Sequence, residues 1–380
     1  MVDNSKPPDD KVSRRKMLGL LGAFACATTF SACSSTFETK SDKNQLNVYS
    51  WADYLHPDVI PEFEKETGIR VVYDTFASNE ALLAKLQAGA SDYDIVVPTG
   101  YMLRQLVKMK LLSGIDHERL RNIGNIMEHF RNPAYDRGLS YSVPYTWGTT
   151  GIAYNAQAIE GVLVRQAFEE QILYVSGART PADWDVFWDR RLKQRITLLD
   201  DARETIGLAL KRRGYSYNTR DEAAIRAAIV DLTEQKPLTM CYTSDQVITQ
   251  LASGDSWLSL VYSGDAYQAR KENEYLKYVI PLSGTSIWTD NLCIPKLAPH
   301  PENAYKWIDF ILRPEIGASI ANFTRYATPN QKAVPLVSEE LRQDRNLYLS
   351  EQVMMRCEEI GDVGPAIRLY DQMWTELKCS

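Results

Sequence analysis

The stretch LNVYSWADY, residues 46–54, decides the fold class. Residues 46–50 alternate like a β-strand and lead into a loop of aromatic and acidic residues. Residues 61–67 then read as a helix with Pro61 in its first turn and Gly68 as its stop. Residues 69–76 are β-branched and aromatic, which predicts a second strand. Strand and helix therefore alternate, and this order predicts an α/β domain with a largely parallel sheet.

The same alternation continues through the chain. Ser78 and Asn79 cap a helix over residues 80–87, and residues 93–97 form a buried strand closed by Pro98. Later segments predict strands over 196–199 and 257–262, and helices over 202–213, 221–236 and 303–312. Ligands of open α/β sheets bind at the carboxyl ends of the strands. The loops at that edge are residues 51–54, 99–101, 200–204, 262–265 and 288–290.

The N-terminus predicts export. Residues 14–16, which follow Ser13, are basic, a short apolar run comes next, and Ser31-Ala32-Cys33 ends the segment. Residues 1–32 are therefore expected to be an export signal. The paired arginines resemble a twin-arginine signal, whereas Met17 leaves the general secretory route open. Cys33 resembles the acylated cysteine of a bacterial lipoprotein box; the alternative is a cysteine that merely lies near the end of a signal. Residues 33–45 read as a polar tether.

Composition is that of a soluble globular protein, with 44% hydrophobic and 24% charged residues. Without residues 1–32 the chain carries 38 basic and 46 acidic residues, a net charge of −8. This balance disfavours nucleic acid and is compatible with a cationic ligand. The later cysteines (Cys241, Cys293, Cys357 and Cys379) are too scattered to predict a zinc site or a redox pair. They can stay unpaired or pair in three ways.

The loops at the sheet edge share one pattern: aromatic residues stand beside carboxylates. A ligand of ammonium groups joined by methylenes needs both residue types. Carboxylates accept charge-assisted hydrogen bonds, and aromatic faces attract cations and cover methylenes. Each residue alone has a simpler reading as well. Asp201 is also an expected helix N-cap, and tryptophans at strand ends often plug the rim of a core.

The chain from residue 33 onward resembles the periplasmic spermidine/putrescine-binding proteins of ABC importers. The matching segments are YSWADY (49–54), FEKETG (63–68), YDIVVP (93–98), YSVPYTWG (141–148), DDARE (200–204), FILRP (310–314) and YATPN (326–330). The resemblance implies a two-lobed α/β fold of the periplasmic-binding-protein type II, with a ligand cleft and hinge between the lobes. It also implies a polyamine ligand, membrane subunits of an ABC importer as partners, a periplasmic location at a membrane surface, and a monomer. It implies neither cofactor, metal nor catalytic residue.

The resemblance carries over residue by residue. Aromatic cleft positions are Trp51, Tyr54, Tyr101, Tyr262, Trp288 and Tyr326, and polar ones are Thr99 and Ser244. Asp201, Glu204 and Asp290 match acids of the spermidine-type members. Asp53 and Asp265 match acids of the putrescine-type members, so the chain mixes both patterns. Ile360 stands where the spermidine type has a glutamine that binds a terminal amine.

The resemblance also implies the domain limits. One lobe is expected to hold residues 46–155 and 287–337, and the other residues 156–286 and 338–380. Residues 159–179 are longer than is usual in the family. The alternatives are a solute-binding protein for a sugar or ferric iron, and a carbohydrate-active enzyme that uses Asp201 and Glu204 as acid and base. Two carboxylates on one helix turn cannot easily flank a glycosidic bond, which disfavours the enzyme.

Overall fold

The computed structural model describes residues 43–76, 78–89, 92–163, 172–175, 178–181 and 183–379, without the side chains of residues 160–182. The expected export signal, Cys33 and most of the tether therefore lie outside the described residues. In these described ranges, none of the helices has both the length and the apolar character required to cross a bilayer.

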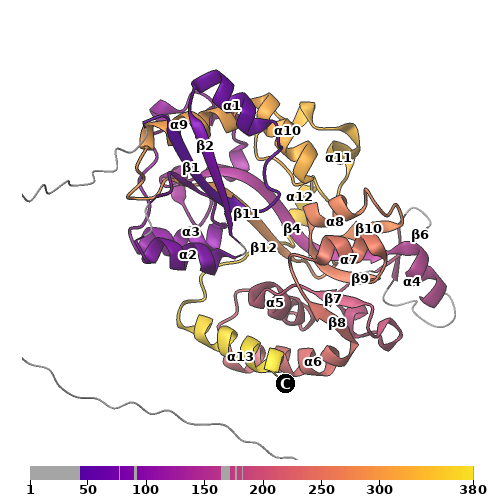
Figure 1. The fold of residues 1–380 in the computed structure, drawn as a ribbon. Helices are drawn as coiled ribbons and strands as arrows, with labels where there is room; N and C mark the ends of the chain where they lie inside the picture. Colours follow the sequence, from indigo (N-terminus) through magenta and orange to yellow (C-terminus); the bar gives the residue numbers. More distant parts are fainter. Residues whose placement is uncertain are drawn as a thin grey trace, which may run out of the picture. The chain divides into compact units, whose positions relative to one another are not determined.

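The N-terminal part of the described chain is the parallel α/β unit that the sequence predicts. Strands β1 (Gln45–Trp51), β2 (Arg70–Phe76) and β3 (Ile95–Val96) form a parallel sheet in the order β2-β1-β3. Helices α1 (Val59–Thr67), α2 (Asn79–Gln87) and α3 (Gly100–Lys108) connect and follow these strands (Figure 1). Helix α1 begins two residues earlier than expected, at Val59, whose N–H donates to His56 O. The loops after β1 and β3 consequently lie at one edge of the sheet.

Strand β4 (Val143–Asn155) is the centre of a larger sheet and is buried over its whole length. Its first half pairs antiparallel with β11 (Ser286–Leu292), and its second half pairs with β9 (Leu258–Tyr262) and β10 (Leu276–Val279). Strands β7 (Ile196–Leu198), β8 (Thr239–Tyr242) and β12 (Glu358–Glu359) complete it in the order β12-β11-β4-β9-β7-β8.

Strand β4 contributes to two hydrophobic cores. Val143 and Trp147 share one core with Val48 of β1. Ile152 and Tyr154 share another with Ile196 of β7. Bridges between Val96 and Cys293 and between Thr99 and Asp290 join the small sheet to the end of β11. The long strands β4 and β11 thus connect the two parts of the fold.

Helices cover both sheets. On the second part, α5 (Ala202–Arg212), α6 (Glu222–Gln235) and α13 (Ile367–Cys379) pack together around Ile206, Ile225 and Tyr370. Helices α7 (Val247–Ser253) and α8 (Ser263–Ala269) flank β9. The longer segment that the sequence marks contains α4 (Ala156–Leu163) and a hairpin of β5 (Ile172–Val175) and β6 (Ala178–Pro181).

The remaining helices follow β11. Helices α9 (Pro301–Ile311) and α10 (Pro314–Thr324) pack against the first part of the fold. Helix α9 corresponds to the helix that the sequence predicts over residues 303–312. Helices α11 (Glu339–Gln343) and α12 (Glu351–Met354) come next, and Leu341 and Leu347 still belong to the core that contains Val48. Short 3-10 turns lie at His117–Arg119, Ile123–Asn125, Glu128–Phe130, Arg137–Leu139, Trp184–Trp188, Arg190–Leu192, Lys236–Leu238, Val334–Leu336 and Gly364–Ala366.

The four cysteines of the described chain are free thiols. Cys293 is fully buried, Cys241 and Cys357 are partly buried, and Cys379 is exposed. Of the possibilities that the sequence leaves open, the structure therefore contains the unpaired one.

Candidate functional site

Asp290 is a deeply buried carboxylate of the predicted site, with 2% of its surface exposed. The hydroxyls of Tyr54 and Thr99 donate to its two oxygens, each at 2.6 Å. Burial raises the pKa of Asp290 to about 6, although both hydrogen bonds favour the charged form. Within the described ranges this carboxylate forms no ion pair with a basic side chain, so it is suited to receive a cation.

Thr99 is positioned by a residue that the sequence suggested only as a helix cap. Asn79, the first residue of α2, donates through its side chain to Thr99 Oγ1 at 3.1 Å. Its amide oxygen accepts from the Thr99 N–H, also at 3.1 Å. Helix α2 therefore fixes the hydroxyl that holds Asp290, and the sequence signal for this role was the polar pair Ser78-Asn79 directly after a strand.

Asp265 and Tyr326 form a second pair. The Tyr326 hydroxyl donates to Asp265 Oδ1 at 2.7 Å. Burial raises the pKa of Asp265 to about 6, and the negative charge of Asp53 acts in the same direction. Gly264 permits this approach, because a Cβ atom there would come within 2.5 Å of the Tyr326 ring.

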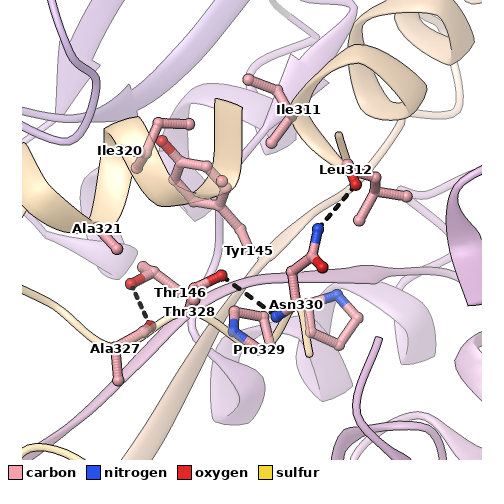
Figure 2. A pocket seen from close by; sticks show the side chains of 12 residues that line it. Tyr145, Thr146, Ile311, Leu312, Ile320, Ala321, Ala327, Thr328, Pro329 and Asn330 are labelled. Carbon is pink, nitrogen blue, oxygen red and sulfur yellow. Dashed lines mark hydrogen bonds between the residues drawn. The ribbon is translucent and has the colours of Figure 1, made fainter. Parts of the chain in front are cut away.

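Figure 2 shows how the segment that carries Tyr326 is anchored. Thr146 of β4 donates to Ala327 O at 3.2 Å, and Asn330 donates to Leu312 O at 2.7 Å. The cavity between them has a volume of about 10 Å³, enough for about one water molecule. Tyr145 lines this cavity and donates from its hydroxyl to Tyr54 O, so one wall supports both Tyr326 and Tyr54.

Asp201 and Glu204 begin helix α5. Asp201 is the predicted N-cap, since its Oδ1 accepts from the N–H groups of Arg203 at 2.8 Å and Glu204 at 3.0 Å. Its other oxygen accepts from the Tyr262 hydroxyl at 3.3 Å. The structure thus gives Asp201 a capping role and an aromatic partner in the site at the same time.

Glu204 is 2% exposed, and Ser286 Oγ lies 2.9 and 2.7 Å from its two oxygens. Burial, and next the charge of Asp201, raise the pKa of Glu204 to about 8. Asp201 and Glu204 therefore lie on one helix turn and each accepts from a hydroxyl of a distant strand, Tyr262 of β9 or Ser286 of β11. Two carboxylates on one turn do not have the facing arrangement that cleavage of a sugar bond requires.

The aromatic residues form a continuous row. Ring centroids are separated by 6.3 Å for Trp51 and Tyr54, 5.5 Å for Tyr54 and Tyr326, 5.2 Å for Tyr326 and Trp288, and 5.7 Å for Trp288 and Tyr262. These residues come from the end of β1 and the loop after it, from the end of β9, from β11 and from the segment after α10. The structure therefore brings five of the six predicted aromatic residues together, with Asp290, Asp265 and Asp201 bonded along the row.

The other predicted residues lie around this row. Asp53 is exposed, has a positive φ of 54° and acts on Asp265 through its charge. Ser244 is half-buried after β8, the parallel neighbour of the strand that precedes Asp201. Tyr101 donates from its hydroxyl to Glu80 Oε1 at 3.2 Å, and the sequence analysis did not include Glu80 in the site. Ile360 is half-buried directly after β12.

The site has the means to bind a cationic chain. Its carboxylates accept charge-assisted hydrogen bonds, and its rings provide faces for cations and methylenes. Within the described ranges, no group of three His, Cys, Asp or Glu residues has an arrangement that could hold a metal ion.

Comparisons with known proteins identify the family and the fold. Residues 58–347 match the family described as bacterial extracellular solute-binding proteins. The chain is 35% identical over 362 residues to a spermidine/putrescine-binding periplasmic protein of Salmonella typhimurium, covering 94% of this chain and 97% of that protein. It is similar to the solved spermidine/putrescine ABC transporter substrate-binding protein PotD of Streptococcus pneumoniae, with a TM-score of 0.75, 32% identity and coverage of 88% and 99%. The solved PotD lipoprotein of Treponema pallidum gives a TM-score of 0.74, 30% identity and the same coverage.

Proposed function

The chain belongs to the family of bacterial extracellular solute-binding proteins, and from that premise we propose that it captures spermidine, putrescine or both and delivers them to an ABC importer. The expected fold, a two-lobed α/β periplasmic-binding-protein fold of type II, is confirmed by its structural neighbours. The protein works outside the cytoplasmic membrane and catalyses no reaction. Its role is to bind a solute and present it to the membrane subunits of the importer.

The observation that carries the proposal is the row of five rings with Asp290, Asp265 and Asp201 bonded along it. Each of these acids accepts a hydrogen bond from a tyrosine hydroxyl. An ammonium group brings charge as well as hydrogen-bond donors, so it is a stronger partner than a phenol. Cation–π contacts add about 0.5–2 kcal/mol each. The sum, less the cost of ordering, is sufficient for a micromolar complex of about −8 kcal/mol.

The two lobes follow from the strands that connect the cores. We assign residues 46–155 and 287–337 to one lobe and residues 156–286 and 338–380 to the other, with β4 and β11 crossing between them. Leu341 and Leu347 pack in the core that contains Val48, and Tyr370 packs against α5 and α6, so the segment after residue 337 contacts both lobes. Site residues come from both lobes: Tyr54, Asp290 and Tyr326 from one, Asp201, Tyr262 and Asp265 from the other. Ligand binding therefore favours hinge closure.

Location follows from the N-terminal sequence. Residues 1–32 direct export, Cys33 is acylated after cleavage, and residues 33–45 tether a monomeric binding protein to the membrane surface. A relative of the same type from Treponema pallidum is described as a lipoprotein, which supports the anchor.

Isothermal titration calorimetry of the purified protein with putrescine, spermidine and glucose tests the proposal. Saturable binding of at least one amine with no heat from glucose is the expected result. Binding of the neutral sugar and of neither amine would overturn the polyamine assignment and leave the family assignment intact.

A further inference from the structure

Ser286 is a fully buried serine at the start of β11, and sequence reasoning did not place it in the site. Its hydroxyl lies 2.9 and 2.7 Å from the two oxygens of Glu204, which is buried as well. A hydroxyl that donates to a carboxylate forms a charge-assisted hydrogen bond, which is stronger than a bond between neutral groups. Ser286 therefore fixes the Glu204 carboxylate against β11.

Strand β11 makes this contact on the same face as two residues of the site. Alternate residues of a strand project to one face, so Ser286, Trp288 and Asp290 share a face of β11. Ser286 and Asp290 are four residues apart, which separates their Cα atoms by about 13 Å along an extended strand. A single strand therefore sets the spacing between the Glu204 carboxylate and Asp290, with Trp288 midway between the two positions.

The first turn of α5 joins Glu204 to the aromatic row by a second route. Glu204 follows Asp201 by three residues, and Asp201 accepts from the Tyr262 hydroxyl at 3.3 Å. The Tyr262 ring centroid lies 5.7 Å from that of Trp288. The turn thus contacts β11 directly, through Ser286, and contacts the row through Tyr262. Both routes place the Glu204 carboxylate at the end of the row where Tyr262 and Trp288 lie.

The basic residue next to Glu204 is engaged elsewhere. The Arg203 guanidinium donates to Gly361 O, Tyr217 O and Asn218 Oδ1, each at 3.0 Å. Among the residues that the structure describes, no Lys, Arg or His nitrogen forms an ion pair with Glu204. A carboxylate has about four lone-pair positions, so the Ser286 hydroxyl leaves acceptor capacity for an ammonium group.

Ser286 also favours the charged form of Glu204. Burial, and next the charge of Asp201, raise the pKa of Glu204 to about 8, whereas the hydrogen bond from Ser286 acts in the opposite direction. Only the ionised carboxylate forms an ion pair with an ammonium group. Removal of the Ser286 hydroxyl therefore releases the Glu204 side chain and disfavours the form that binds a cation.

We propose that Ser286 is a positioning residue that holds the Glu204 carboxylate on the site face of β11, where Glu204 receives one ammonium group while Asp290 receives another. This inference rests on the proposed function and states how the spacing between the two carboxylates is maintained. Ser286 acts on the ligand only through Glu204. Its hydroxyl should therefore contribute to affinity when Glu204 is present, and contribute little when the carboxylate has been replaced.

The test is a double-mutant cycle by calorimetry at pH 7.5, with whichever of spermidine and putrescine the parent binds more tightly. Ser286→Ala and Glu204→Gln are each expected to weaken binding about tenfold or more, the loss typical of one hydrogen bond to a charged group. The double variant is expected to bind within about threefold of Glu204→Gln, because the serine acts through the carboxylate. Ser286→Thr keeps the hydroxyl on a residue that strands favour, and it is expected to restore most of the affinity.

Ser142→Ala is the matched control, since Ser142 is also fully buried and donates to a carboxylate, Asp136 Oδ2, at 2.7 Å. It should bind the amine like the parent, and circular dichroism checks that every variant is folded. Parental affinity of Ser286→Ala or of Glu204→Gln, losses that multiply in the double variant, or equal losses in Ser286→Ala and either Ser286→Thr or Ser142→Ala would overturn the inference while the polyamine assignment stands. A parent that binds neither amine would overturn the proposed function and, with it, this inference.

Discussion

Asp290→Asn separates binding from stability, because the two depend on the charge of Asp290 with opposite signs. The carboxylate is 2% exposed and accepts hydrogen bonds from the neutral hydroxyls of Tyr54 and Thr99, and burial raises its pKa to about 6. This pKa lies well above the ordinary aspartate value of about 3.9. At about 1.36 kcal/mol per pKa unit, this difference corresponds to about 3 kcal/mol by which the ionised form destabilises the ligand-free fold. The protonated Asp290 carboxyl avoids this destabilisation. Its contribution to the free energy of unfolding is fully present below about pH 4 and is lost as the pH rises through about 6.

Asparagine keeps the shape of the side chain and removes the charge. Its amide NH₂ is a donor and accepts no hydrogen bond, so only one of the Tyr54 and Thr99 hydroxyls can still donate, to the amide oxygen. The other hydrogen bond is lost at a cost of about 1–2 kcal/mol. Removal of the buried charge offsets this loss. The free energy of unfolding of ligand-free Asp290→Asn at pH 7.5 is therefore expected to lie within about 2 kcal/mol of the parent value.

Binding should respond much more strongly. Truncating one partner of a buried charge pair costs about 2–4 kcal/mol, which is about 30-fold to 900-fold in Kd. Calorimetric titration with spermidine and putrescine measures this loss, and urea unfolding of the ligand-free protein measures stability. Asp58→Asn is the control, since the side chain of Asp58 is 87% exposed and undergoes the same chemical change. Parental affinity in Asp290→Asn, or a loss of affinity explained by a largely unfolded protein, would refute this reasoning.

Three further predictions concern the second acid pair, the packing of the aromatic row and the anchor. Because burial raises the pKa of Glu204 to about 8, the free energy of unfolding of the ligand-free protein should decrease between about pH 4.5 and 8. Glu204→Gln should make this decrease smaller, as measured by urea unfolding. An unchanged pH profile contradicts the assignment. Gly264→Ala should displace Tyr326 and weaken amine binding at least fivefold by calorimetry, unless the ring has room to move, in which case affinity stays parental. Cys33→Ala should release the exported protein from sedimented membranes, and continued sedimentation would remove the lipid anchor from the proposal.

The local order of strands and helices in residues 46–98 was predictable, because it depends on hydrophobic periodicity and on capping residues close together in the sequence. The composition of the site was also predictable from its loops. The pairing within it was not. Tyr54 bonds Asp290, 236 residues away, and its near neighbour Asp53 is exposed. Such partners are decided by which strands lie side by side, and sequence spacing does not encode that.

Glu80 illustrates a second limit. An acid in the first turn of a helix has a sufficient local explanation, because it interacts favourably with the helix dipole. Only the approach of α3 brings it into contact with Tyr101. Residues with a complete local explanation are therefore the ones that sequence reasoning is most prone to leave out of a site.

Strand β4 has a consequence for how the protein denatures. One continuous strand supplies Val143 and Trp147 to one core and Ile152 and Tyr154 to the other. If either core unfolds, the part of β4 that belongs to it loses its partners, and this disrupts the sheet that the rest of β4 forms with the other core. Neither half therefore keeps an intact sheet alone. Two-lobed proteins whose cores share no strand can unfold one lobe before the other. Here we expect a single cooperative transition, with the same midpoint for tryptophan fluorescence and far-UV circular dichroism.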